Sequence, residues 1–216
     1  MHSFTEENYL KTIYHLLCGN QNATTNDIAA AVGTKAASVT DMLKKLSEKK
    51  LINYARYQGV TLTADGEKIA LHIVRKHRLW EHFLVDKLKF KWDEVHEMAE
   101  ELEHISSVEL INRLDEFMGC PQFDPHGDPI PDTNGQITNQ HLQPALALCK
   151  DQSGTIAGVA DHSATFLQYL EKTQLTIGQT ITVIEVTDYD LSVVLQTNNK
   201  ELNISREVAK NLLILV

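Results

Sequence analysis

The 216-residue sequence predicts a mainly α-helical protein with a small all-β tail. Apolar residues recur at helical spacing as far as about residue 117, whereas β-branched runs separated by turns follow from about residue 142. Between them, residues 119–135 hold all but one of the prolines, interspersed with Asp, Asn and Gly, and are expected to form a loop or linker. We expect three domains, spanning residues 1–70, 71–140 and 141–216.

The first domain is expected to begin with three helices and a hairpin. Helical spacing predicts helices over residues 5–17, 25–33 and 35–52, and "INYARYQGVTLT" (52–63) predicts two short strands around a Gln-Gly turn. Helix, tight turn, lysine-bearing helix and hairpin is the order of a winged helix-turn-helix, whose second helix lies in the major groove of DNA. A three-helix packing module with a solvated lysine face is the alternative.

The candidate DNA contacts lie on the lysine-bearing helix and the hairpin. Small Ala36 and Ala37 would allow a close approach to DNA, and the neighbouring polar side chains could reach bases or phosphates. Contacts to phosphate supply position and affinity rather than sequence choice. The predicted DNA-binding residues are Thr34, Lys35, Ala37, Ser38, Thr40, Asp41, Lys44, Lys45, Arg56 and Tyr57.

The remaining elements follow the same patterns. The spacing predicts a long helix from Thr63 to about Lys89, then shorter helices at about 93–104 and 106–117. In the tail, five strands and the helix "SATFLQYLEK" predict a small barrel. The runs interpreted as strands are "ALALCK", "GTIAGVA", "QTITVIEVT", "LSVVLQT" and "LLILV".

The net charge of −9 is unevenly distributed along the chain. Residues 1–90 carry 13 Lys and Arg against 9 Asp and Glu, whereas the remainder carries 7 against 20. A basic front half could face phosphates and an acidic back half could attract cations, although charge that merely confers solubility is the alternative.

Composition also bears on the compartment. No run reaches the roughly 18 apolar residues that a membrane span needs, and the N-terminus lacks the basic region and apolar block of a secretory signal. The three cysteines are scattered, odd in number and never in C-x-x-C spacing, which favours a reducing compartment. We therefore expect a cytoplasmic protein.

The stretch "HEMAEELEH" (96–104) carries the strongest chemical signal. On a helix, His96, Glu100, Glu103 and His104 fall within about 100° of one another. Upstream, "HRLWE" places His77 and Glu81 four residues apart, again on one face. Carboxylate and imidazole donors together favour Mn(II) or Fe(II) over soft, thiophilic ions.

Four other interpretations of this stretch exist. The zinc-protease pattern H-E-x-x-H fails because Glu100 stands where the second histidine is required. A di-iron carboxylate bundle needs two E-x-x-H helices, and only one such pair, Glu101 with His104, is found. A solvated acidic helix stays open, as does a carboxylate/histidine metalloenzyme, which would need an open coordination position and a substrate cleft.

Taken together, the sequence resembles the diphtheria-toxin-repressor family of metal-dependent transcription regulators, which includes the manganese transport regulators. The tail resembles the SH3-like (FeoA-like) domain of the family's three-domain members. The stretches that carry the resemblance are "NYLKTIY" (8–14), "ASVTDMLKKL" (37–46), "GVTLTADGEKIA" (59–70), "RKHRLWEHFL" (75–84), "VHEMAEELEH" (95–104) and "DPHGDPIP" (124–131).

The resemblance implies a homodimer that binds a palindromic operator when loaded with metal and represses metal-uptake genes, rather than an enzyme. It places Glu100, Glu103 and His104 at the primary regulatory site and His77, Glu81 and His96 at an ancillary site. Iron-sensing members have cysteine at the position of Glu100 and manganese-sensing members a carboxylate. The implied metal is therefore Mn(II) first, Fe(II) next, with other divalent transition metals after them.

Two further ligands are implied by the resemblance. Asn8 stands where better-known members have Met or Asp, and its amide oxygen would be a weaker, uncharged ligand. A helix cap at position 8 is the alternative. Asp161, in "VADHS", would complete the ancillary site, as in similar three-domain manganese regulators; a turn aspartate before the "SATFLQYL" helix is equally consistent.

Overall fold

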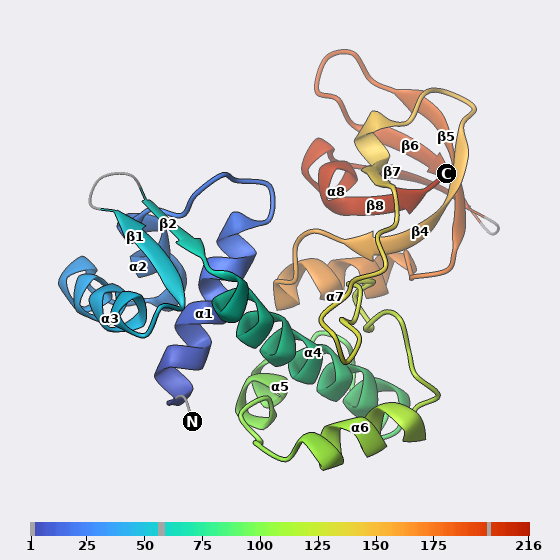
Figure 1. Ribbon diagram of the computed structural model, residues 1–216. Coiled ribbons are helices and arrows are strands. Elements are labelled where there is room, and N and C mark those ends of the chain that lie inside the picture. Colours follow the sequence, from blue (N-terminus) through green and yellow to red (C-terminus); the bar gives the residue numbers. More distant parts are fainter. Residues whose placement is uncertain (1–2, 56–58, 198–199) are drawn as a thin grey trace. The chain divides into compact units, whose positions relative to one another are not determined.

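The computed structural model describes residues 3–55, 59–197 and 200–216 and forms two compact units (Figure 1). The amino-terminal unit comprises residues 1–77, 100–108 and 131–137, and the carboxy-terminal unit comprises residues 78–99, 109–130 and 138–216. The expected domain boundaries after residues 70 and 140 remain a prediction. Within the described residues, no helix combines the length and apolar character needed to cross a membrane.

Three helices pack at the start of the amino-terminal unit: α1 (Phe4–Leu17), α2 (Thr25–Val32) and α3 (Ala36–Glu48). Ser3 caps α1 and Thr24 caps α2, each in a capping box with the acidic residue three positions later. The cap of the first helix is therefore Ser3, and the alternative of a cap at position 8 is wrong. The core of this packing contains Leu10, Ile13, Ile28, Val39, Leu43 and Leu46, all fully buried.

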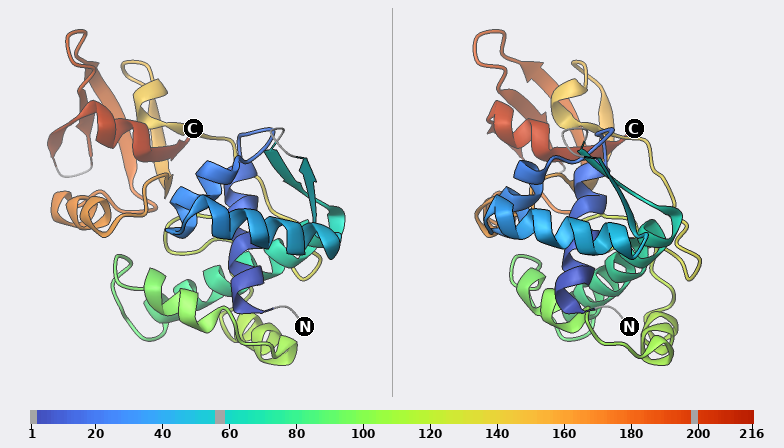
Figure 2. Two further views of the ribbon diagram at one scale, coloured as in Figure 1. Left: turned by 90° about the vertical axis from the view of Figure 1, so that its left-hand side faces the viewer. Right: turned by 60° about the vertical axis from the view of Figure 1, so that its left-hand side comes forward.

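A two-stranded hairpin follows α3. Strands β1 (Ile52–Ala55) and β2 (Gly59–Leu62) pair antiparallel, with Ile52 opposite Leu62. Figure 2 shows this hairpin extending from the end of α3, which crosses α1. Gly66 holds the next helix against the hairpin base, because a Cβ there would lie 1.9 Å from the Leu51 carbonyl oxygen. The predicted winged helix-turn-helix is confirmed.

Three helices follow the wing: α4 (Ala64–Asp86), α5 (His96–Leu102) and α6 (Val108–Phe117). The first two are shorter than the patterns indicated, since α4 ends before Lys89 and α5 begins only at His96. Helix α6 buries Ile111 and Leu114 but leaves Leu110 and Phe117 exposed, at 43% and 66%. It is thus amphipathic with additional apolar side chains on its outer face.

The carboxy-terminal unit contains a six-stranded antiparallel sheet in the order β3-β8-β4-β5-β6-β7. Helix α7 (Ala164–Thr173) packs its Phe166, Leu167 and Leu170 into the core that the sheet covers, and a short α8 (Arg206–Asn211) precedes the last strand. The strands are β3 (Leu142–Pro144), β4 (Ser153–Val159), β5 (Thr180–Val186), β6 (Val193–Gln196), β7 (Glu201–Ile204) and β8 (Leu212–Leu215).

The predicted β-rich tail is confirmed, with two corrections. The run "ALALCK" is not a strand, because Pro144 leads into a 3-10 turn over Ala145–Ala147. The predicted count of five strands is also wrong, because the sheet has six. Its two edge strands, "LQP" and "ELNI", were not predicted from the sequence.

Candidate metal centres and DNA-binding face

The DNA-binding residues predicted on α3 lie at its surface. All are exposed except Thr40, which is half-buried. A groove of about 630 Å³ runs between α3, the wing and the start of α2, and Thr40, Lys44 and Tyr54 line it. The start of α2 adds Thr24, Thr25 and Asn26, which the sequence reasoning did not include. Arg56 and Tyr57 lie outside the described residues.

Lys44 and Lys45 have different partners. The Lys44 ammonium lies 3.2 Å from the exposed Asp41 carboxylate, on the solvent side of α3. The Lys45 ammonium instead lies 2.9 Å from Oε1 of Glu6, which also accepts a hydrogen bond from Lys49 at 2.7 Å. Glu6 is buried on α1, so this ion pair ties α1 to the C-terminal half of α3. Lys45 is therefore held by the protein rather than directed freely toward solvent.

Glu103 is the centre of a buried cluster in the amino-terminal unit, here called the Glu103 cluster. Its carboxylate is fully buried; Oε2 lies 2.7 Å from Nδ1 of His77, and Oε1 lies 4.0 Å from Nε2 of His104. The Lys11 ammonium of α1 reaches the same group, 2.7 Å from Oε1 and 2.8 Å from Oε2, and also Glu100 at 3.2 Å. Lys11 from α1, His77 from α4 and His104 from the segment after α5 thus surround the Glu103 carboxylate.

The orientation of His104 is set by a residue that the sequence reasoning missed. Its Nδ1 lies 2.9 Å from the Glu7 carboxylate, so a neutral ring that donates Nδ1–H there presents Nε2 toward Glu103. Phe4 stacks on the His104 ring, with centroids 4.6 Å apart. The neighbouring Asn8 is exposed on the second turn of α1.

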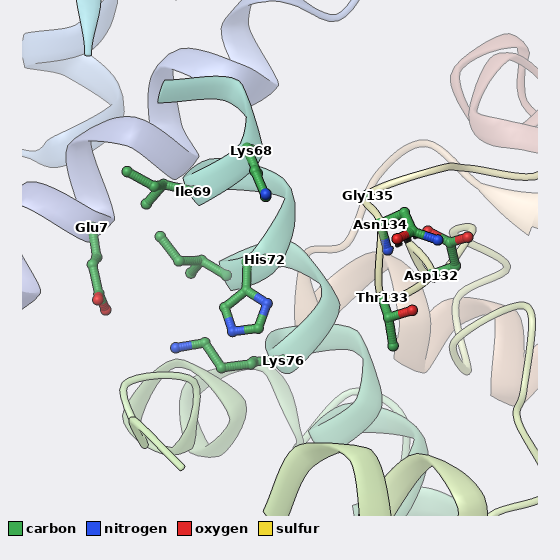
Figure 3. Close-up of a pocket in the computed structure, with 10 residues that line it drawn as sticks. Glu7, Lys68, Ile69, His72, Lys76, Asp132, Thr133, Asn134 and Gly135 are labelled. Carbon is green, nitrogen blue, oxygen red and sulfur yellow. Dashed lines mark hydrogen bonds between the residues drawn. The ribbon is translucent and has the colours of Figure 1, made fainter. Parts of the chain in front are cut away.

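A cavity of about 320 Å³ lies beside this cluster, bounded by Glu7, α4 and the loop 132–135. Figure 3 shows Lys68, His72 and Lys76 following one another along α4, with Lys76 extending toward the side of Glu7. Lys76 is 4% exposed. Burial lowers the pKa of Lys76, while the charges of Glu7 and Glu103 act in the opposite direction. Two lysines, Lys11 and Lys76, therefore accompany the carboxylates of the cluster.

The carboxy-terminal unit holds a second group, here called the His126 cluster, formed by Glu81, Asp124 and His126. One donor atom from each lies within 4.8 Å of the others, and all three residues are buried. Nε2 of His126 lies 2.8 Å from the Trp92 carbonyl oxygen and must donate to it, so Nδ1 faces Glu81 at 3.6 Å. A histidine whose second nitrogen donates to a backbone carbonyl is oriented as metal-binding histidines are.

The loop that carries Asp124 and His126 is fixed by close packing on β4. Gly127 has φ +88°, and a Cβ there would lie 2.0 Å from the Ala157 carbonyl oxygen. The Val159 N–H donates to the His126 carbonyl, while Asp124 accepts the backbone N–H groups of His126 and Asp128. The motif "DPHGDP" thus encodes a rigid turn that places two donors beside α4.

Charge in the two clusters supports a cation at each. Burial raises the pKa of Asp124, and the nearby Asp128 and Glu81 carboxylates raise it further. Burial tends to lower the pKa of His126, but the hydrogen bond and charge of Glu81 prevail and raise it to about 9. In the Glu103 cluster, burial tends to raise the pKa of Glu103, yet His77 and Lys11 outweigh it and keep the pKa low.

The donor types of both clusters suit a divalent ion, and in the His126 cluster one donor atom of each residue already lies within 4.8 Å of the others. In the His126 cluster, Arg78 lies 3.7 Å from the Asp124 carboxylate and offsets part of its repulsion with Glu81, and a divalent cation would relieve the rest. In the Glu103 cluster, Oε1 of Glu103 is buried without a hydrogen bond among the described residues. Lys11, however, already lies against this oxygen.

Comparison with known proteins gives the family. The chain matches the models "Iron dependent repressor, N-terminal DNA binding domain" over residues 1–60, "Iron dependent repressor, metal binding and dimerisation domain" over 63–132, and "FeoA domain" over 146–215. It is 32% identical over 123 residues to the HTH-type transcriptional regulator MntR of Lysinibacillus sphaericus, spanning 85% of that protein and 55% of this chain. The chain belongs to the diphtheria-toxin-repressor family of metal-dependent transcriptional repressors.

Similarity to two further proteins supports the same family assignment. The iron-dependent repressor IdeR of Mycobacterium tuberculosis is 33% identical over 127 residues, or 59% of this chain and 55% of that protein. The match thus spans about half the length of IdeR. A solved structure described as a manganese-dependent transcriptional repressor in complex with manganese covers 97% of this chain and 99% of its own, with 31% identity and a TM-score of 0.88. The family consists of transcriptional repressors that bind divalent metal, not enzymes.

Within this repressor fold the predicted ligands are distributed as follows. Glu103 lies near His104, and both Glu103 and Glu100 contact Lys11. His77, predicted for the ancillary site, lies against Glu103. Nδ1 of His96 lies 3.4 Å from Oε1 of Glu81. Glu81 follows His77 by one turn of α4. Asp161 accepts the Ser163 N–H at 2.8 Å at the start of α7 and is outside the His126 cluster. The sequence reasoning missed Glu7, Lys11, Asp124 and His126.

Proposed function

We propose that this chain is a metal-activated repressor that binds a palindromic operator as a homodimer and controls genes for manganese uptake. The observation that carries the proposal is the position of α1. Glu6 on this helix pairs with Lys45 of α3, the proposed recognition helix, and with Lys49 at its C-terminal cap. Glu7 and Lys11 contact His104 and Glu103. A rearrangement at the Glu103 cluster therefore has a direct mechanical route to the helix that faces DNA.

We propose Mn(II) as the preferred ion, with Fe(II) next and other divalent transition metals after them. The candidate ligands are Glu100, Glu103, His104, His77 and Asn8 in one unit and Glu81, His96, Asp124 and His126 in the other, with Asp161 as a further one. Hard oxygen and imidazole donors favour these ions. All three cysteines are exposed, which supports a thiolate-free site and, as expected for a repressor, a reducing cytoplasm.

When bound, such an ion supplies positive charge that holds the carboxylates together. The side chains of the protein orient the ligands and contact the DNA. His104 and His77 orient Glu103, and Asp124 and His126 are held by their rigid loop. DNA binding is assigned to the exposed face of α3, where Ser38 and Asp41 would contact bases and Lys44 would contact phosphate. The apolar outer face of α6 is the proposed self-association surface.

The test is a gel shift on the region upstream of a metal-uptake gene, titrated separately with Mn(II), Fe(II) under anaerobic conditions, and Zn(II). We expect a specific protein–DNA complex that forms only when metal is added. Among the three ions, Mn(II) should give half-maximal complex at the lowest free concentration relative to the concentration at which that ion is available in cells. The variant Glu103→Gln should lose the metal response while still binding DNA weakly. Operator binding that is unchanged by chelators would contradict the proposal.

A further inference from the structure

Lys11 lies where a cation of the Glu103 cluster would be expected. Its ammonium touches both Glu103 oxygens, at 2.7 and 2.8 Å, and Glu100 at 3.2 Å. It reaches there from α1 across 92 residues of sequence. The lysine is 8% exposed and Glu103 is fully buried, so this ion pair is largely withdrawn from water. Such a buried pair forms only where opposite charges and geometry match closely.

The charges of the cluster limit what else it can hold. Glu7, Glu100 and Glu103 supply three negative charges, and Lys11 and Lys76 supply two positive ones. Adding a divalent ion beside both ammonium groups would leave a net positive charge in a buried region. If Lys11 instead leaves the carboxylates, the same three charges are balanced by the ion and Lys76 alone. Electrostatics therefore favours exchange over simultaneous occupation.

We propose that the Lys11 ammonium and the divalent ion are alternative occupants of the Glu100–Glu103 carboxylates, so that Lys11 sets the metal concentration at which this cluster is loaded. In the metal-free protein Lys11 keeps Glu103 paired and α1 in place. On loading, Lys11 has to leave, and α1 loses that contact while Glu6 continues to hold the recognition helix. The inference rests on the proposed metal regulation and deepens it.

The test uses the full chain carrying Glu81→Gln, which disables the His126 cluster, and compares Lys11 with Lys11→Met. Methionine keeps most of the apolar stem but removes the charge. In chelator, we expect Lys11→Met to melt roughly 5–15 °C lower, because the buried Glu103 loses its lysine partner and keeps His77. Saturating Mn(II) should restore most of that loss. Calorimetry should show Mn(II) binding about tenfold or more tighter than with Lys11 present. Lys210→Met, which removes an exposed lysine beside Glu207 on α8, serves as the matched control and should change neither quantity.

The outcomes separate this inference from the proposed function. If the parent chain binds Mn(II) and Lys11→Met binds it with equal affinity and an equal gain in melting temperature, the Lys11 proposal is overturned and metal regulation stands. If neither protein binds Mn(II), the Lys11 proposal is overturned, and if the chain with Glu81 intact also fails to bind Mn(II), the proposed function fails with it. Should Lys11→Met not fold, Lys11→Arg decides. It keeps the charge in a bidentate form, and we expect Mn(II) affinity equal to or weaker than that of the parent. Tighter binding by Lys11→Arg would overturn the proposal.

Discussion

The imidazole of His126 links protonation to metal binding. Its pKa is raised to about 9, above the ordinary value near 6.5, so the charged ring stabilises the folded, metal-free protein. That contribution is complete below about pH 6.5 and is lost as pH rises through 9. The raised pKa of Asp124 acts in the same direction, because the fold favours its protonated form. We therefore expect the melting temperature in chelator to fall between pH 6.5 and 9, with Mn(II) stabilising the protein more at the higher pH.

Calorimetry in two buffers of different ionisation enthalpy checks the same prediction. Metal needs neutral imidazole and an ionised carboxylate, so binding at pH 7.5 should release about one proton or more from the His126 cluster. His126→Gln should abolish that release. His141→Gln, which removes an exposed histidine from the same unit, is the matched control. Equal Mn(II) affinity at pH 6 and pH 8.5 would contradict the assignment of His126 and Asp124.

The side chain at position 100 is expected to set which metal ion activates the protein. The carboxylate of Glu100 is half exposed beside Lys11 and offers hard oxygen donors. Glu100→Cys should move the activation ranking toward Fe(II), Co(II) or Zn(II) and weaken the Mn(II) response, since thiolate favours softer and later ions. Competition titrations followed by DNA binding measure the ranking, and an unchanged ranking would place the regulatory site elsewhere.

Asn8→Asp tests whether the exposed side chain on the second turn of α1 contributes a ligand. A charged oxygen there should tighten Mn(II) binding. Ser3, not Asn8, caps α1, so a change in helix stability cannot account for such a gain. Unchanged Mn(II) affinity would remove Asn8 from the candidate ligands, and the proposed site would rest on the remaining residues.

Among the elements, α3 carries the proposed DNA recognition. Lys44→Ala should weaken binding to all operator sequences alike, whereas Ser38→Ala should change the sequence preference. With about three phosphate contacts per subunit, affinity should fall with salt at a log–log slope near −5. Lys44→Ala should reduce the steepness of that slope, by roughly two for a dimer. Salt-independent binding, or a slope that Lys44→Ala leaves unchanged, would contradict the phosphate assignment.

The outer face of α6 carries the proposed self-association. Leu110 and Phe117 are seven residues apart and share this face, where both are exposed. Phe117→Glu should therefore shift the protein toward monomer in sedimentation experiments and weaken operator binding. Glu116→Gln, a neighbouring exposed position, is the control. A dimer that persists at micromolar concentration in Phe117→Glu would place the interface on another surface.

The elements show where sequence reasoning succeeds and fails. Helices α1 to α4 and strands β4 to β6 were predictable because their apolar periodicity is strong. The edge strand β7, "ELNI", alternates weakly and was passed over. Glu103 and His104 were singled out by helical spacing, although α5 ends before them at Leu102. Asp124 and His126 depend on a loop fixed by Gly127 against β4. Lys11 was missed because its carboxylate partner lies 92 residues away.

At the scale of the whole molecule, metal and operator must influence each other equally. If Mn(II) raises operator affinity by some factor, commonly about 5- to 150-fold, operator DNA must tighten Mn(II) binding by the same factor. We expect α1 to carry this coupling, because Glu6 holds Lys45 and Lys49 while Glu7 and Lys11 contact the Glu103 cluster. The two factors can be measured independently, by DNA titration with and without metal and by metal titration with and without operator.

The variant Glu6→Gln tests whether α1 couples metal binding to operator binding. Burial tends to raise the pKa of Glu6, but hydrogen bonds from Lys49 and Lys45 overcome this and lower it to about 2, so the carboxylate is ionised at neutral pH. Its loss should reduce the coupling by roughly two- to thirtyfold while Mn(II) affinity without DNA stays the same. Glu171→Gln, whose carboxylate pairs with Lys91 at the surface, is the control. If Glu6→Gln keeps full coupling, the signal reaches the recognition helix by a path other than the Glu6 ion pairs, and α1 serves only as packing.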